Sequence, residues 1–227
     1  MFKEILSIWK KKDLFSQAFE ESVEMLKVDK EMFEEAVKSL RTSDTGEYAE
    51  DVFNKDKLIN KYQRDVRKKV LTHLVMSGKI EIPSGLVLVS IVIDIERIGD
   101  YTKNIMDLAL AHKTKLHAGS FEKELKNKES KVTQFFDMTI DAFSKSNRDT
   151  ARLVMIDYKK ISGYCDRTIN SLIEDANEFT PSDAVTLALY LRYLKRIAAH
   201  LHNICTSVVN PFHRIGYIEK GKNQNEQ

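Results

Sequence analysis

Residues 93–105 read IDIERIGDYTKNI, a stretch that combines a helical apolar pattern with two carboxylates one turn apart. Apolar residues in and around it recur every three or four positions, the spacing of an α-helix that buries one face. This seam comprises Ile91, Ile95, Ile98, Thr102, Ile105 and Ala109. Glu96 and Asp100 project roughly opposite the seam, with Gly99 between them. The stretch therefore predicts a long helix with one buried face and a concentration of negative charge on another.

The composition favours an all-α protein. The chain has 227 residues, of which 42% are hydrophobic, so it can build a sizeable core. It contains three Pro and eight Gly, which is typical of long helices with few turns. Acidic and basic residues nearly balance, with a formal net charge of +2, so no broad basic surface is indicated and nucleic acid is not expected as a partner.

Turn residues divide the chain into six predicted helices. Asp44 and Gly46, Gly78, Gly119 and Asn147 mark the first four breaks. Two prolines stand where a helix would begin, a position that does not need their missing N–H; these are Pro83 and Pro181. The predicted helices span residues 13–42, 46–77, 83–113, 119–146, 148–177 and 181–210.

The sequence contains an internal repeat. Residues 194–204, LKRIAAHLHNI, match residues 95–105, IERIGDYTKNI, when the chain is shifted by 99 positions. A shift of 101 positions aligns Asp56 with Asp157. The predicted fold is thus a tandem repeat of two antiparallel three-helix bundles, residues 1–115 and 116–227, joined into an elongated six-helix molecule.

The acidic pair of the third helix needs a physical explanation. Acids opposite an apolar seam are normally solvated. Val89 and Ile93, however, lie on the same face as Glu96 and Asp100, so this face is not expected to be freely solvated. Two crowded carboxylates on such a face repel each other or take up protons unless a cation neutralises them, and a hard metal ion would do so. Gly99 leaves room for a close approach.

Residues 94–105, DIERIGDYTKNI, resemble the signature of the PhoU family, which recurs once in each of two three-helix bundles. The likeness extends over nearly the whole chain through the repeat and through two further segments. These are LRYLKRI at residues 191–197 and NICTSVV at residues 203–209.

The resemblance implies a regulator of phosphate uptake and phosphate-responsive signalling that acts by binding other proteins. Its expected partners are phosphate transporter or sensor-kinase components at the membrane. Members of the family bind iron or zinc clusters through paired acids, and no organic cofactor is expected. On this chain the resemblance assigns Glu96 and Asp100 as metal ligands, with Asp56 on the facing second helix as a further candidate.

The chain departs from the family pattern in both motifs. Lys195 and Ala199 replace the acidic pair of the second motif, and neither side chain can ligate a metal in its usual state. In the first motif Tyr101 replaces the usual His. We therefore expect one metal site or none. Lys195 is expected to pair with Asp157 or to reach solvent.

Other functional classes find little support. The sequence has no nucleophile elbow, no phosphate-cradling glycine loop and no Ser/His/Asp arrangement, so the protein is not expected to be an enzyme. A di-metal oxidase or hydrolase would need Glu and His ligands on four helices, which the sequence does not supply. Cys165 and Cys205 lack any ligand spacing and are expected to be buried, idle thiols. The main alternative is a metal-free helical scaffold.

The expected location is the cytoplasm. The longest apolar run, GLVLVSIVIDI at residues 85–95, is about half of the ~20 residues that a membrane span requires. Near the N-terminus, apolar residues such as Phe2 and Trp9 alternate with lysines, so this segment either packs on the bundle, frays or makes peripheral contact with the inner face of the membrane. The apolar residues 85–93 also favour burial against a second subunit, hence a homodimer.

Overall fold

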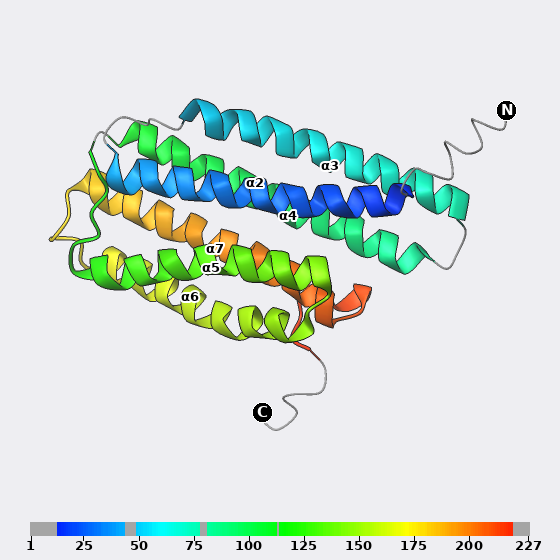
Figure 1. Cartoon of the computed structure of the whole chain (residues 1–227). Helices are drawn as coiled ribbons and strands as arrows, with labels where there is room; N and C mark the ends of the chain where they lie inside the picture. The colour runs from blue at the N-terminus through cyan, green and yellow to red at the C-terminus, as the bar shows by residue number, and fades with distance from the viewer. Residues whose placement is uncertain (1–12, 44–48, 78–80, 113, 220–227) are drawn as a thin grey trace, which may run out of the picture.

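The computed structural model describes residues 13–43, 49–77, 81–112 and 114–219, which form six long helices and two short 3-10 helices without strands (Figure 1). The elements are α2 (Leu14–Thr42), α3 (Ala49–Ser77), α4 (Ile82–Ala111), η2 (Gly119–Phe121), α5 (Glu122–Lys145), α6 (Arg148–Glu174), α7 (Pro181–Val209) and η3 (Phe212–Arg214). The predicted all-α fold is confirmed. The predicted breaks at Asp44, Gly46 and Gly78, and the N-terminal segment 1–12, lie outside the described residues.

Side-chain caps explain where several helices begin. Asp13 accepts a hydrogen bond from the Ser16 backbone N–H at 2.8 Å, at the start of α2. Thr180 caps α7 by accepting from the Asp183 N–H at 3.1 Å, and Pro181 occupies the first turn as predicted. These starts lie within a residue of the predicted ones because each cap is local to the sequence.

The fifth predicted helix, residues 148–177, is too long at its C-terminus, because α6 ends at Glu174. Asp175 accepts a hydrogen bond from the Asn177 N–H at 2.9 Å. This side-chain contact offers the backbone an alternative to the next helical hydrogen bond and turns the chain toward α7. The fourth predicted helix, residues 119–146, likewise starts with the separate 3-10 turn η2 before α5.

The two three-helix repeats pack side by side along their lengths. In Figure 1, α2, α3 and α4 form the upper layer and α5, α6 and α7 the lower one. Contact between the layers is made by α4 with α7 and by α2 with α5. The division of the chain at residue 115 stays a prediction. No described helix is long and apolar enough to cross a membrane.

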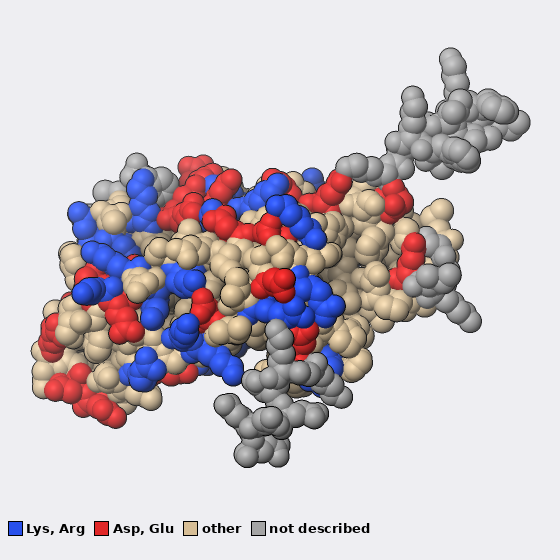
Figure 2. All heavy atoms as spheres, turned by 60° about the horizontal axis from the view of Figure 1, so that its bottom comes forward, with Lys and Arg blue, Asp and Glu red and all other residues tan. Residues whose placement is uncertain are grey.

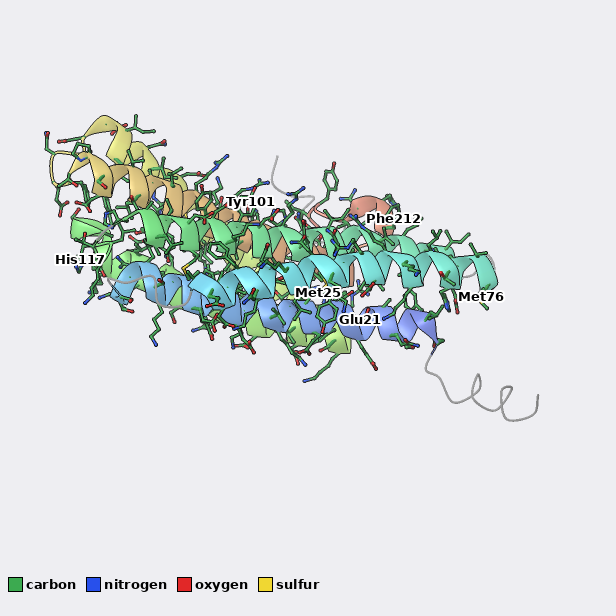
Figure 3. The ribbon with its side chains drawn as sticks, turned by 90° about the horizontal axis from the view of Figure 1, so that it is seen from above. Glu21, Met25, Met76, Tyr101, His117 and Phe212 are labelled. Atoms are coloured by element: carbon green, nitrogen blue, oxygen red, sulfur yellow. The ribbon has the colours of Figure 1, made fainter. Side chains whose placement is uncertain are left out.

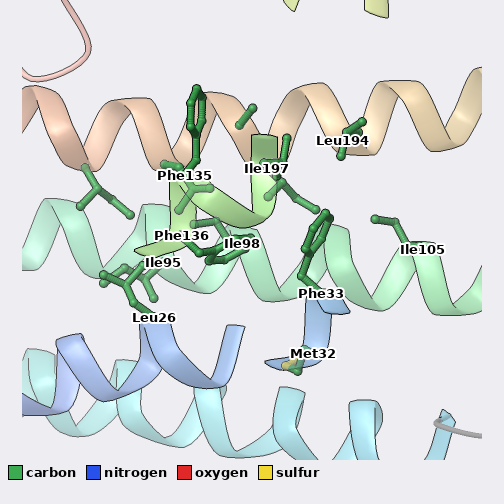
Figure 4. Packing of buried hydrophobic residues seen from close by; sticks show 14 of the residues in the cluster. Leu26, Met32, Phe33, Ile95, Ile98, Ile105, Phe135, Phe136, Leu194 and Ile197 are labelled. Carbon is green, nitrogen blue, oxygen red and sulfur yellow. The ribbon is translucent and has the colours of Figure 1, made fainter. Parts of the chain in front are cut away.

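The repeats bury one continuous hydrophobic core. The predicted seam of α4 is buried from Ile91 to Ile105. Ile98 and Ile197, which match in the repeat, are both fully buried in this core (Figure 4). The rings of Phe33 in α2 and Phe136 in α5 lie 5.4 Å apart. Because the third helix of each repeat supplies part of the same core, the repeats stabilise each other.

A buried arginine ties the two repeats together at one end. The Arg41 side chain of α2 donates to Glu129 at 3.0 Å and to Glu122 at 2.6 Å, both on α5. The Tyr190 hydroxyl of α7 donates to Glu129 at 2.7 Å. Although burial favours the neutral acid, the Arg41 guanidinium lowers the pKa of Glu122 to about 2. This network satisfies charges that would otherwise be costly between the layers.

Candidate metal centre in the first repeat

The acidic pair of α4 is half-buried. The side chains of Glu96 and Asp100 are 14% and 28% exposed. Burial, and next the charge of Asp100, raise the pKa of Glu96 above its usual value. Arg97 lies at the solvent side of the pair and donates to Asp100 at 2.8 Å. The pair therefore lies at the edge of the helix bundle, and only its outer side is neutralised by an arginine.

Asp56 of α3 faces the same region. Its carboxylate lies 3.3 Å from the Lys103 ammonium of α4, which also lies 3.4 Å from Asp100. Burial favours the neutral amine of Lys103, but Asp56 and Asp100 together raise its pKa. Lys103 thus supplies positive charge between the carboxylates of two helices.

A fourth carboxylate, Asp29 of α2, lies fully buried behind them at 0% exposure. Neither of its carboxylate oxygens has a hydrogen-bond partner among the described residues. Burial, followed by the charges of Asp56, Glu96 and Asp100, raises the pKa of Asp29 well above 3.8. Without a cation, burial and the neighbouring acids therefore favour the neutral, protonated form of this carboxyl group.

Gly99 makes the close approach of α2 and α4 possible. A Cβ atom at this position would lie 3.0 Å from the Asp29 Oδ1 atom and 3.2 Å from the Ile59 Cδ1 atom. Any larger residue would push Asp29 away from Glu96 and Asp100. The glycine between the two acids therefore has a structural explanation, which is the space that the Asp29 carboxyl group occupies.

The four carboxyl groups supply the kind of donor that a hard cation prefers. The orphaned oxygens of Asp29 also fit an ion in this region. However, in the described part of the chain no three His, Cys, Asp or Glu side chains come together as a metal ion would require. The donor chemistry fits, while Lys103 competes with an ion for Asp56 and Asp100.

The corresponding region of the second repeat carries its own cation. Lys195 of α7 pairs with Asp166 of α6 at 2.6 Å, and not with Asp157 as predicted. Asp157 instead contacts Lys131 of α5 at 3.0 Å and Lys160 at 2.8 Å. The prediction was wrong because Asp157 faces α5, whereas its supposed counterpart Asp56 faces α4.

The two motifs meet where α4 packs against α7. His200 contacts Asp94 at 2.7 Å between the ring Nδ1 and the carboxylate, and Asn203 donates to the same carboxylate at 3.2 Å. Tyr101 stacks on His200 with ring centroids 5.7 Å apart and accepts a hydrogen bond from Arg196 at 3.1 Å. Only the Nδ1 atom of His200 has a hydrogen-bond partner among the described residues, while Tyr101 has a packing role between the repeats.

The remaining sequence candidates have structural roles. Cys165 and Cys205 are free and buried, as predicted. Burial raises the pKa of both thiols to about 12, so neither forms a thiolate readily.

Sequence reasoning missed Asp29 and Lys103. Asp29 carries a recognisable signal, because it is four residues from both Met25 and Phe33 on the buried stripe of α2. A carboxylate at a core position indicates a functional or paired group. Lys103 gives no such signal, since its role depends on the position of Asp56 on another helix.

Comparison with known proteins agrees with this architecture. The family model of the PhoU domain matches residues 23–109 and 129–208. A PhoU homolog of Thermotoga maritima, named as an accessory protein of a phosphate-specific transport system, is 27% identical over 92% of this chain and 91% of its own length. A protein of the same name from Clostridium acetobutylicum is 26% identical over 71% of this chain and 75% of its own length.

Solved PhoU structures share the fold. The crystal structure of PhoU from Pseudomonas aeruginosa superposes with a TM-score of 0.76 at 21% identity, covering 86% of this chain and 95% of that one. The PhoU regulatory protein of Streptococcus pneumoniae gives a TM-score of 0.76 at 20% identity, covering 86% of this chain and 93% of that one. With two matched domains that take up most of its helices, the chain belongs to the PhoU domain family.

Proposed function

We propose that this protein regulates a phosphate-specific transport system, and the signalling that responds to phosphate, by binding transporter or sensor-kinase components at the cytoplasmic face of the membrane. The observation that carries this proposal is the pair of PhoU domains, because the curated relatives are named as accessory proteins of such systems. The accessory role makes turnover by the chain itself unnecessary. The apolar side chains of Leu86 and Ile93, exposed on α4, favour a homodimer.

We further propose that the first repeat holds one iron or zinc ion. Asp56, Glu96 and Asp100 would bind it, and Asp29 adds a fourth carboxyl group from α2. The ion would supply the positive charge that joins carboxylates on three helices. Lys195 and Ala199 in the second repeat argue for a single site. A metal-free scaffold, in which Lys103 is the permanent counter-ion, is the alternative function.

Capture from membranes tests the regulatory role. The full chain, tagged and expressed in its host, is expected to retain phosphate transporter or sensor-kinase subunits from detergent-solubilised membranes, and its deletion is expected to change phosphate uptake. Complementation with the wild-type gene is the control. Unchanged uptake in the deletion strain, together with capture of no transporter or kinase subunit, would remove the proposal.

Metal analysis separates the metal site from the scaffold. Freshly purified wild-type protein is expected to contain up to one equivalent of iron or zinc, and the Glu96→Ala, Asp100→Ala double variant close to none, because the loss of two carboxylates leaves too few ligands. Asp107→Ala is the matched control, since Asp107 is an exposed acid on the same helix. Equal metal content in the wild type and the double variant would favour the scaffold.

A further inference from the structure

The solvent face of α3 carries a basic stripe that neither the metal site nor the family assignment uses. Lys57, Lys61, Arg64 and Lys68 follow one another at spacings of four, three and four, so they lie in one line along the helix. All four side chains are exposed. Figure 3 shows the molecule from above, on the side of α3, with Met76 labelled at the C-terminal end of this helix.

The charge of this basic stripe is poorly compensated. Lys61, Arg64 and Lys68 form no ion pair with any carboxylate among the described residues. The opposite side of the molecule differs, because basic and acidic side chains alternate there (Figure 2). On α5, for example, Lys126 pairs with Glu122 and Lys145 with Asp141. The uncompensated positive charge is therefore a local property of α3.

The same line continues into an apolar end. The next positions on this face are Leu71 and Val75, which are 66% and 79% exposed. Met76 is 78% exposed beside them, and Ile82 is exposed where α4 begins. Exposed large apolar side chains that gather at one end of a molecule mark a surface that contacts a protein or a membrane.

The N-terminal segment joins the described structure at this apolar end. The Phe15 ring of α2 lies 5.6 Å from the His73 ring near the end of α3. The twelve residues before Asp13 include Phe2 and Trp9, together with four lysines. Aromatic residues interleaved with lysines are typical of segments that bind membrane interfaces.

We propose that the basic stripe and apolar end of α3 bind the surface of a membrane that contains anionic lipids. The lysines and the arginine pair with lipid headgroups, while Leu71, Val75 and Met76 enter the interfacial region. Nucleic acid would pair with the positive charges of the basic stripe, but it would leave the apolar side chains of Leu71, Val75 and Met76 exposed to water. A second copy related by a two-fold axis through the stripe would set like charges against each other. The proposal goes beyond the proposed function and does not depend on it.

Vesicle binding tests this proposal. The full-length protein is expected to bind vesicles of phosphatidylglycerol in phosphatidylcholine and to ignore vesicles of phosphatidylcholine alone. Since each basic residue near an anionic membrane strengthens binding about fivefold, the Lys61→Gln, Arg64→Gln, Lys68→Gln variant should bind about a hundredfold more weakly. Leu71→Ser with Val75→Ser should weaken binding about tenfold.

Matched controls make the result specific. Lys123→Gln, Lys126→Gln, Lys145→Gln on α5 removes the same charge from exposed positions and should leave vesicle binding within about twofold of the wild type. Circular dichroism should show that every variant is folded. Equal loss in both triple variants, or equal binding to both kinds of vesicle, would overturn the proposal. Binding of duplex DNA that the α3 variant loses, without vesicle binding, would overturn it in favour of a nucleic acid.

Discussion

Replacing Asp29 with asparagine is expected to raise the free energy of unfolding of the metal-free protein by about 1–3 kcal/mol at neutral pH. The pKa of Asp29 is raised well above 3.8 in the folded state, chiefly by burial. Between the unfolded and folded pKa values, the folded state therefore binds more protons than the unfolded state. The contribution of Asp29 to wild-type stability consequently falls as pH rises above about 4. The variant lacks this dependence, so its advantage should vanish near pH 4 and grow toward neutral pH.

Bound metal should make the wild type more stable than the Asp29→Asn variant. An ion that binds Asp29 in its ionised form displaces the proton, so added zinc or ferrous iron should stabilise the wild type by about 2.7 kcal/mol at a hundred times its dissociation constant. Asp29→Asn should respond far less, because the amide carries no charge. Asp107→Asn on α4 is the control, and it should behave as the wild type. Urea titrations between pH 4 and 8, with and without metal, measure both effects, and identical curves for the two variants would contradict the role of Asp29.

Replacing Phe136 with alanine should cost about 3–5 kcal/mol of unfolding free energy. This ring is fully buried and contacts Phe33 across the boundary between the repeats. Because both repeats contribute to one core, the variant should still unfold in a single transition at a lower denaturant concentration. Chemical denaturation followed by circular dichroism and by tyrosine fluorescence measures this.

The controls for this prediction use the same residue type. Phe212→Ala, at a residue of η3 that is 41% exposed, should change stability far less than Phe136→Ala does. The double variant of Phe33 and Phe136 should reveal a coupling of about 0.5–1.5 kcal/mol beyond area burial. Two separate unfolding transitions in the Phe136 variant would show instead that the repeats fold as independent units.

Much of the fold could be predicted because its determinants are local. The spacing of Ile91, Ile95 and Ile98 requires a helix with one buried face, and the caps at Asp13 and Thr180 act within three residues of themselves. The end of α6 was misjudged for a local reason too. Asp175 looked like a continuation of the helix, but its side chain competes for the backbone.

Only part of the candidate site could be predicted from local sequence patterns. Glu96 and Asp100 lie on one helix, so their spacing alone predicts that they are neighbours. The predicted pairing of Lys195 with Asp157 was wrong. Aligning two segments of sequence does not establish which neighbouring helix a side chain faces. Asp157 and Asp166 lie on the same helix, and only the rotation of α6 decides that Asp166 meets Lys195.

The sequence by itself determined six amphipathic helices and their order, because these follow from periodicity within each segment. It also determined their duplication, by comparison of one half of the chain with the other, and an acidic pair beside a glycine. Only the tertiary structure decided that Asp29 is buried without a partner behind that pair, that Lys103 lies between Asp56 and Asp100, and that the two repeats share one core. These features depend on the distances between side chains on different helices. Such distances are fixed by how the helices pack, and a helical period in one segment contains no information about them.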